Sequence, residues 1–392
     1  MFWQYVHDAV IAVLRFERRF DPFFRPALDA VLREPAARLV QYLINRRRQD
    51  DGLALGEERE QPDEAGHLDT IIATMAAYMK ETWPPGNFQR AGNTKTHAIL
   101  RGEVIVRDDL PTDLRHGVFA EPKSYRAWVR LAGPGPDWPR DIDDVGVLSC
   151  AIKLMGVDGP KLLDDEKFTQ DFLSISIPTF TTPDTRANAK LQAWILKRRP
   201  FFYFIDPNDS HLLDALMQGL WSKTQSNPLG ERYWSCVPYR LGEKQAMMYS
   251  FQPRSSVYRK IPRLPLAPPD NYLRENIART LSQQDVVFDI LVQLQQDPFR
   301  MPIENASVRW PETLSPFLPV AELRIPRQTF NTPAQLAFAD NLSFNPWHCI
   351  AEHRPLGNQN RARRRLYFEL SRYRQEMNRH PHVEPTGDEA FS

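Results

Sequence analysis

The middle of the sequence contains a long series of short segments rich in β-branched and aromatic residues, separated by clusters of Pro, Gly and Asp. The eight strand candidates are Thr96–Arg107, Ser124–Leu131, Gly146–Gly156, Phe172–Phe180, Glu231–Pro238, Lys244–Gln252, Val286–Gln295 and Val320–Ile325. Eight antiparallel strands can close into a barrel that has no exposed edge, and a two-sheet sandwich is the alternative. The predicted fold class is α+β, with an eight-stranded antiparallel β-barrel at its centre.

Segments with helical periodicity flank and interrupt these strands. They are Pro26–Arg48, Asp69–Thr82, His211–Trp221, Pro269–Ser282, Pro333–Asn341 and Asn360–Arg379. We therefore expect an N-terminal helical arm over residues 1–90, a barrel with helical insertions over 91–330 and a C-terminal helical segment over 331–392. The polar end of the chain, His380–Ser392, is expected to be frayed.

Composition excludes several classes of protein. Of the 392 residues 42% are hydrophobic and 25% charged, which is typical of a globular chain. The net charge of +1 gives no general attraction to nucleic acid, so no nucleic-acid partner is predicted. Three scattered cysteines, Cys150, Cys236 and Cys349, do not suit a disulfide framework and favour a reducing, cytoplasmic location.

No segment has a continuous apolar run that could cross a bilayer, so no transmembrane segment is predicted. The stretch Phe2–Leu14 is apolar and begins with aromatic residues. It could dock on a partner or make peripheral contact with a membrane surface. A helix packed on the body of the protein is the preferred interpretation.

The last helical candidate, Asn360–Arg379, contains neither Gly nor Pro and carries an unusual trio of residues. At about 100° per residue, Arg363, Tyr367 and Arg374 lie close together beside the apolar stripe of the helix. Two cations next to a phenol favour the phenolate. A phenolate is a good ligand for ferric iron, and Tyr can ligate haem. The alternative is a solvated basic helix with a packed Tyr.

Two residues in the strand candidates could take part in chemistry. His97 opens the first strand, and a His that faces the interior of a barrel can be a general acid or base. A hydrogen-bonded core His is the alternative. Arg130 lies in a strand that reads as buried, and a buried Arg needs an anionic partner. That partner could be an Asp or a carboxylate of a cofactor.

Several segments, taken in order, resemble the core of the catalases. They are Thr96–Leu131, Ala151–Leu154, Asp171–Phe180 and the Arg-Xaa-Xaa-Xaa-Tyr motif Arg363–Tyr367. The segment Phe344–Gly357 is similar to one found in the shorter catalase-like haem proteins of bacteria. The resemblance implies the catalase barrel, haem b as cofactor and a peroxide as substrate.

The resemblance also implies roles for single residues. His97 corresponds to the distal histidine, and Tyr367 to the proximal ligand of the haem iron. Arg363 corresponds to the residue that bonds the phenolate, while Arg130 and Arg374 correspond to arginines that meet the haem propionates. A distal His can take a proton from a peroxide and return it to the leaving oxygen.

The distal side departs from the catalase pattern. Ser176 stands where catalases have an Asn, and its shorter side chain would hold a peroxide differently. Ala132 replaces the Ser that orients the distal His. Thr94 replaces an Arg that binds a propionate, and Arg90 could substitute for it. Thr96 stands where catalases usually have Val, as in the allene oxide synthase branch.

These features predict a haem-dependent enzyme with His97, Thr96 and Ser176 as its catalytic residues. Its expected substrates are organic hydroperoxides of the fatty-acid type, processed by peroxidase or isomerase/lyase chemistry. The alternatives are a haem sensor or store with little turnover, a weak hydrogen peroxide catalase, and a haem-free protein that docks through its basic last helix. By resemblance, a homo-oligomer is possible.

Two further groups of residues are expected to be structural. The loop with His348, Cys349 and His353 lacks a recognisable zinc spacing. The acidic group Asp141, Asp143 and Asp144 lacks the EF-hand spacing and is expected to form a solvated loop.

Overall fold

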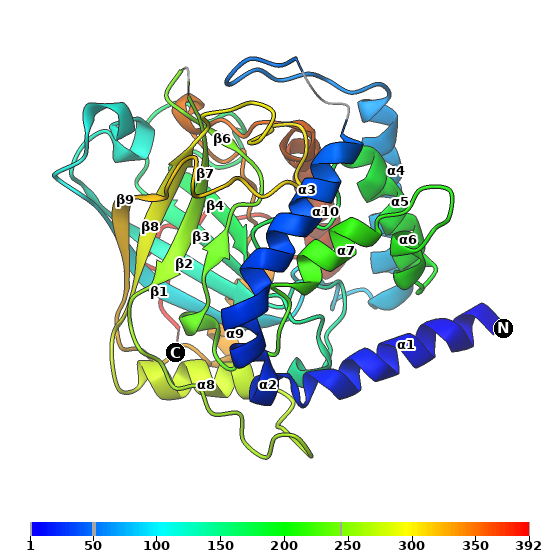
Figure 1. Ribbon diagram of the computed structural model, residues 1–392. Helices are drawn as coiled ribbons and strands as arrows, with labels where there is room; N and C mark the ends of the chain where they lie inside the picture. The colour runs from blue at the N-terminus through cyan, green and yellow to red at the C-terminus, as the bar shows by residue number, and fades with distance from the viewer. Residues whose placement is uncertain (1, 49–51, 244, 392) are drawn as a thin grey trace.

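The computed structural model describes residues 2–48, 52–243 and 245–391, and its centre is a closed antiparallel barrel (Figure 1). The strands in ring order are β5 (Tyr233–Trp234), β4 (Thr169–Ile175), β3 (Ser149–Met155), β2 (Ser124–Ala132), β1 (Thr96–Val106), β9 (Leu318–Ile325), β8 (Val286–Leu294) and β7 (Gln245–Pro253). Pairing of β5 with β7 closes the ring, and β6 (Tyr239–Leu241) pairs with β7 outside it. The predicted fold class, an α+β protein built on an eight-stranded antiparallel barrel, is confirmed.

Helices cover one side and one end of this barrel (Figure 1). They are α1 (Phe2–Arg18), α2 (Asp21–Leu28), α3 (Glu34–Arg47), α4 (Glu64–Thr82), α5 (Thr185–Leu196), α6 (Phe201–Phe204), α7 (Leu212–Gly219), α8 (Tyr272–Leu281), α9 (Pro333–Asn341) and α10 (Asn358–Asn378). Helix α4 packs against α5 and α10, which places the C-terminal helix inside the helical layer. None of the helices in the described part of the chain combines the length and apolar character that a bilayer span requires.

The predicted elements differ from the observed ones mainly at their ends. The candidate Phe172–Phe180 begins earlier and ends at Ile175, because Pro178 and Ser176 lead the chain out of the sheet. The candidate Glu231–Pro238 contributes only the two residues of β5. Helices α5 and α6 and strand β6 were not predicted. In the candidate Lys244–Gln252, Lys244 lies outside the described residues.

The expectation of a frayed C-terminal tail is wrong for its described part. The Trp128 indole N–H donates to the Glu389 carboxylate at 2.8 Å. The ring of Phe391 packs against the rings of Trp128 and Phe338, at centroid separations of 5.8 and 5.2 Å. The tail therefore covers the outer face of β2 and contributes apolar surface of its own, which its polar composition concealed.

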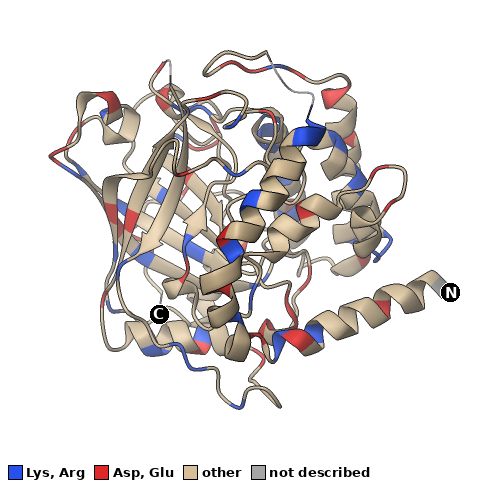
Figure 2. Ribbon diagram, viewed as in Figure 1, with Lys and Arg blue, Asp and Glu red and all other residues tan. Residues whose placement is uncertain are grey.

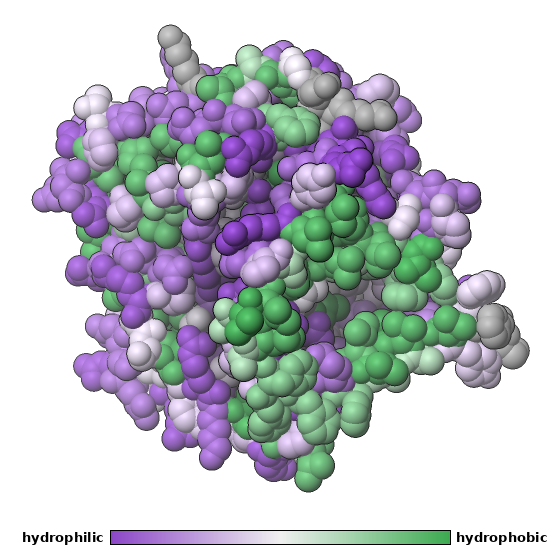
Figure 3. Space-filling view, in the orientation of Figure 1, coloured by the Kyte–Doolittle hydropathy of each residue, from purple (hydrophilic) through white to green (hydrophobic). Residues whose placement is uncertain are grey.

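The N-terminal arm is docked at points along its length and leaves much apolar surface uncovered. Trp3 packs edge-on against Phe202 at 5.6 Å, and the Arg18 guanidinium donates to the Val145 carbonyl. Figure 3 shows apolar side chains gathered over α1, α2 and α3. Exposed members of this patch include Phe16 and Phe23. Contact of this arm with a partner or a membrane stays a prediction.

Closure of the barrel depends on a tyrosine where strand pairing is short. Because β5 has two residues, it pairs with β4 only at Ile175, opposite Trp234. Tyr249 of β7 replaces the missing ladder at Leu173: its hydroxyl donates to the Leu173 carbonyl and accepts from the Leu173 N–H, both at 2.8 Å. Tyr249 is fully buried, so these bonds have no competition from water.

Tyr249→Phe is expected to lower the free energy of unfolding by about 1–3 kcal/mol, because it leaves two backbone groups of Leu173 buried and unsatisfied. Urea denaturation measures the change. Tyr258→Phe is the matched control, since the described chain offers no hydrogen bond to that hydroxyl, and it should cost under about 0.5 kcal/mol. Equal costs for the two variants would contradict this account of closure.

Candidate functional site

Three arginines from distant parts of the chain meet in the interior beside one carboxylate. Arg130 of β2 and Arg374 of α10 are each 3% exposed, and Arg90 precedes β1. The Asp340 carboxylate, at the end of α9, is the negative group whose charge acts on all three. Three guanidinium charges therefore share one carboxylate in a poorly solvated place. Such an arrangement is costly unless further negative charge neutralises it.

Hydrogen bonds fix the three guanidinium groups in place. The Arg130 Nη2 donates to the Thr96 hydroxyl at 2.7 Å, and that hydroxyl donates to Asp340 Oδ1 at 3.1 Å. Arg374 donates to the backbone carbonyl of Asp340. Arg90 Nη2 donates to the Ala339 carbonyl at 2.8 Å. The sequence could not place Arg90, and the structure places it in this group.

The cluster has unused hydrogen-bond donors. Arg90 Nη1 and Arg130 Nε are enclosed and lack a hydrogen-bond partner in the described chain. Burial lowers the pKa of Arg90 to about 10. Burial and the charge of Arg90 lower the pKa values of Arg130 and Arg374 far below the ordinary value for arginine. Two carboxylates from a ligand would supply both the missing acceptors and the missing charge. The residues present thus fit the propionates of a haem.

His97 lies on β1, next to the residue that holds this cluster. Its side chain is 1% exposed, and both ring nitrogens lack a hydrogen-bond partner in the described chain. Burial and the charges of Lys95, Arg274 and Arg130 lower its pKa well below the ordinary value. The imidazole is therefore neutral at neutral pH and free to accept a proton.

A buried ion pair lies close to His97. Lys95 Nζ is 2.7 Å from Asp141 Oδ1, and the same oxygen is 3.8 Å from His97 Nδ1. The Asp141 side chain is fully buried, and its other oxygen accepts the Leu273 N–H at 2.8 Å. The prediction that Asp141 lies in a solvated loop is wrong, because the loop folds inward onto this lysine.

Asp144 of the same loop lies against Gly133, which also borders the histidine. A β-carbon built on Gly133 would lie 2.4 Å from Asp144 Oδ2 and 3.7 Å from His97 Nε2. Burial raises the pKa of Asp144 to about 6. The carboxyl is therefore enclosed, and its assignment to a solvated loop was wrong as well.

Helix α10 carries the other predicted site residues. It begins after Gly357, which has a φ of 83°. A β-carbon built on Gly357 would lie 2.3 Å from the Ile303 carbonyl oxygen, so a larger residue is excluded there. Arg363 is buried, and its guanidinium lies 5.9 Å from the ring centre of half-buried Tyr367. The Arg363 Nη1 donates to Asn360 Oδ1 at 3.1 Å. Arg363 thus lies beside the ring of Tyr367, and Tyr367 precedes Arg374 of the arginine cluster by about two helical turns.

Ser176 lies at the end of β4 and away from this cluster. Its hydroxyl accepts the Leu148 N–H at 2.8 Å, and the residue lines a groove of about 990 Å³ between α3 and the barrel. The structure therefore brings His97, Thr96 and Arg130 together with Arg374. It joins Arg363 and Tyr367 to them through α10. Ser176 instead bonds Leu148, at the end of the segment 144–148 that is opposite to Asp144.

Sequence reasoning missed Lys95, Asp141 and Asp340 as site residues. Lys95 could have been found, because residues two apart on a strand share a face and Lys95 precedes His97 by two. Asp141 and Asp340 come from loops and helix ends far along the chain, and no local pattern marks them.

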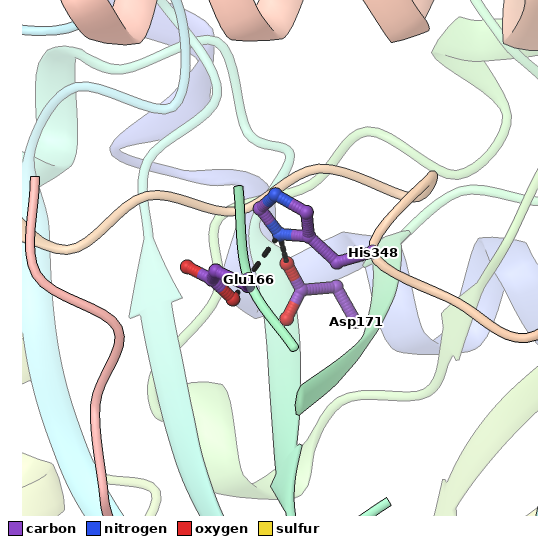
Figure 4. A group of neighbouring side chains, drawn as sticks. All are labelled: Glu166, Asp171 and His348. Carbon is purple, nitrogen blue, oxygen red and sulfur yellow. Dashed lines mark hydrogen bonds and ion pairs between the residues drawn. The ribbon is translucent and has the colours of Figure 1, made fainter. Parts of the chain in front are cut away.

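A buried ion network secures the loop that precedes α10 (Figure 4). Lys153 of β3 pairs with Glu166, and its Nζ lies 2.8 Å from Asp171 Oδ1. His348 Nδ1 contacts Asp171 Oδ2 at 2.9 Å, and its Nε2 contacts Asp165 at 2.9 Å. Glu166, Asp171 and His348 are close enough to hold a metal ion, but the Lys153 ammonium already occupies the place of the cation. The network favours a structural role for this loop.

Comparison with known proteins gives a fold and no close relative. No protein-family model matches the sequence, and no curated protein matches it. Among solved structures, catalase A from Saccharomyces cerevisiae is 14% identical with a TM-score of 0.62, covering 88% of this chain and 72% of that one. A fungal catalase is 14% identical with a TM-score of 0.59, covering 84% and 68%. A bacterial catalase is 15% identical with a TM-score of 0.52, covering 85% and 66%. The chain has the catalase-like fold.

The ion network predicts a pH dependence of stability. Burial and Lys153 oppose protonation of His348, but Glu166, Asp165 and Asp171 outweigh them and raise its pKa to about 9. A raised pKa in the folded state stabilises the fold below the unfolded value near 6.5, and this contribution, on the order of 3 kcal/mol, is lost as the pH rises through 9.

Denaturation of the wild type and of His348→Gln between pH 6 and pH 10 tests this. The free energy of unfolding of the wild type should exceed that of the variant most at pH 6, and this difference should shrink steadily towards pH 10. His380→Gln, at the exposed end of α10, is the control and should show no such trend. A difference that is independent of pH would contradict protonation of His348 in the folded protein.

Proposed function

We propose that this protein binds haem b with Tyr367 as the iron ligand and processes peroxides. The observation that carries the proposal is the excess of buried positive charge at Arg90, Arg130 and Arg374, which the two propionates of a haem would neutralise. Tyr367 supplies a phenol on the helix that ends in this cluster, with the Arg363 cation beside its ring. When bound, a ferric haem would supply the oxidising centre for cleavage of the peroxide O–O bond.

In this proposal, His97 moves the proton. A neutral, buried imidazole with two free nitrogens can take the proton of a hydroperoxide and return it to the leaving oxygen. The Asp141 carboxylate lies 3.8 Å from the ring, and the charge of Lys95, together with burial, opposes protonation of the resting imidazole. The distal base is thus held ready at neutral pH.

The proposed substrates are organic hydroperoxides of the fatty-acid type, and the proposed reaction is of the peroxidase or the isomerase/lyase kind. Two distal features support this choice. The Thr96 hydroxyl is engaged between Arg130 and Asp340, so the residue before the distal His is fixed by polar contacts. The Ser176 hydroxyl is engaged by the Leu148 N–H, which makes it a poor substitute for an Asn that binds hydrogen peroxide. A cytoplasmic location and self-association stay predictions.

The test is the ultraviolet–visible spectrum of protein expressed with a haem precursor, read before and after a hydroperoxide is added. The wild type should show the spectrum of a ferric high-spin haem with a Tyr ligand and should respond to the hydroperoxide. Tyr367→Phe should lose or change this spectrum. Arg130→Met should weaken haem binding about tenfold or more, since it removes a charge-assisted contact.

Two conservative variants serve as controls for these effects. Tyr373→Phe lies on the same helix, and Arg126→Met lies on the same strand with its side chain exposed. Both should keep the wild-type spectrum and haem affinity. An unchanged spectrum in Tyr367→Phe, or a well-folded wild type that takes up no haem, would overturn the proposal. Faster turnover of hydrogen peroxide than of organic hydroperoxides would overturn the substrate class alone.

The environment of His97 predicts a shift in the pH dependence of the reaction. Arg274 donates to the backbone carbonyls of His97 and Thr96 at 3.2 and 2.6 Å, and its charge helps to lower the pKa of the imidazole. Arg274→Gln should raise that pKa, so the acid limb of the pH–rate profile should move up by several tenths to about one unit. Arg274→Lys keeps the charge and should keep the wild-type limb. If the acid limb of the pH–rate profile lies at the same pH in all three proteins, His97 is not the proton acceptor.

A further inference from the structure

A groove of about 990 Å³ opens between α3 and the barrel, outside the arginine cluster and the histidine site. One wall consists of Arg33 and the side of α3 from Glu34 to Asn45, and the other comes from β5, the end of β7 and the loop 300–313. Ser176 forms part of its lining. In Figure 3 polar side chains run along the barrel-facing edge of α3. The volume lies in the range of sites that bind a small organic molecule.

The lining of the groove is strongly basic. Seven lining residues are Lys or Arg and three are Glu, and Figure 2 shows basic positions recurring along α3. The three carboxylates are neutralised within the groove: Glu34 pairs with Arg309, Glu231 with a lysine, and Glu312 with two arginines. Arg38, Arg259 and Arg300 line the groove and form no ion pair with any described residue. Arg259 donates to the Gly230 carbonyl at 3.0 Å, whereas the guanidinium groups of Arg38 and Arg300 have no hydrogen bond to a described residue either and are left for an anionic ligand.

Aromatic and aliphatic surface lies next to these cations. Trp234 and Trp221 both line the groove, together with Tyr42 and Ala37 of α3. Guanidinium groups stack on the tryptophans, that of Arg232 at 4.9 Å from the ring of Trp234. A ligand that fits here would therefore carry both an acidic group and a hydrocarbon chain.

The groove connects to the histidine site through the segment 144–148. Lys223, which lines the groove, donates its backbone N–H to the Gly146 carbonyl at 3.0 Å. Two residues later along the segment, Leu148 bonds the hydroxyl of Ser176. At the other end of the segment, Asp144 lies against Gly133 beside His97. Two residues of the groove lining, Ser176 and Lys223, are thus hydrogen-bonded to the five-residue segment whose first residue, Asp144, borders Gly133.

We propose that this groove binds the carboxylate and hydrocarbon chain of a long-chain acid hydroperoxide, with Arg38 and Arg300 holding the carboxylate. The inference rests on the proposed function, because it supplies the binding site for the substrate of that reaction. The groove thereby selects acids over neutral hydroperoxides, which need no basic lining.

The test measures binding to the holoprotein by titration calorimetry, with linoleic acid and its methyl ester as probes below their micelle-forming concentrations. The acid should bind more tightly than the ester. The double variant Arg38→Gln/Arg300→Gln should weaken binding of the acid about three- to tenfold and leave binding of the ester unchanged. Both side chains are exposed, so the substitutions should not disturb folding. Arg107→Gln, an exposed arginine at the end of β1, is the charge-matched control and should bind both probes like the wild type.

Kinetics provide a second readout. The double variant should raise KM for the hydroperoxide of linoleic acid without lowering kcat, and KM for cumene hydroperoxide should stay constant. Equal affinity for acid and ester, or an equal loss in Arg107→Gln, would overturn the groove as the binding site. A protein that takes up no haem but still binds the acid through Arg38 and Arg300 would overturn only the proposed function, so the two failures are distinguishable.

Discussion

Beside the first residue of β1, the buried positive charge exceeds the charge of the one nearby carboxylate. Arg90, Arg130 and Arg374 come from three separate parts of the chain and share Asp340. Buried charges of one sign repel each other in a medium that screens them poorly, so the fold must hold them there by hydrogen bonds. The bonds to backbone carbonyls and to Thr96 do this. Under the proposed function, the two propionates of a haem supply the negative charge that this cluster lacks.

Much of the remaining structure serves to bring α10 to this place. The helix starts at a glycine that no other residue could replace, and the loop before it is tied to β3 and β4 by the network around Lys153. At its first turn, Arg361 pairs with Glu58, Glu64 and Glu304. These contacts fix the helix at its N-terminal end. Arg374 then reaches the arginine cluster near its C-terminal end, with Tyr367 between the two anchor points.

The sequence predicted those parts of the site that lie in regular elements. Strand periodicity gave the positions of His97 and Arg130, and the spacing along one helix gave Tyr367 and Arg374. The carboxylate of Asp141, which lies 3.8 Å from His97 Nδ1, was not predicted correctly, because it comes from a loop rich in aspartates that reads as solvated. Burial of Asp141 depends on Lys95, which is distant in the sequence, so local composition gives the wrong environment. Long-range pairing of charges is the information that a single sequence does not display.

The segment 144–148 gives the distal side of the site its particular character. Asp144 faces the histidine across Gly133, while Leu148 binds the hydroxyl of Ser176 at the edge of the groove. A serine at this position is short enough to be held by the backbone, whereas a longer amide would extend beyond it. Under the proposed function, the hydroxyl of Ser176 is thus engaged by the backbone, and the residue forms part of the wall against which a larger, acidic molecule can lie.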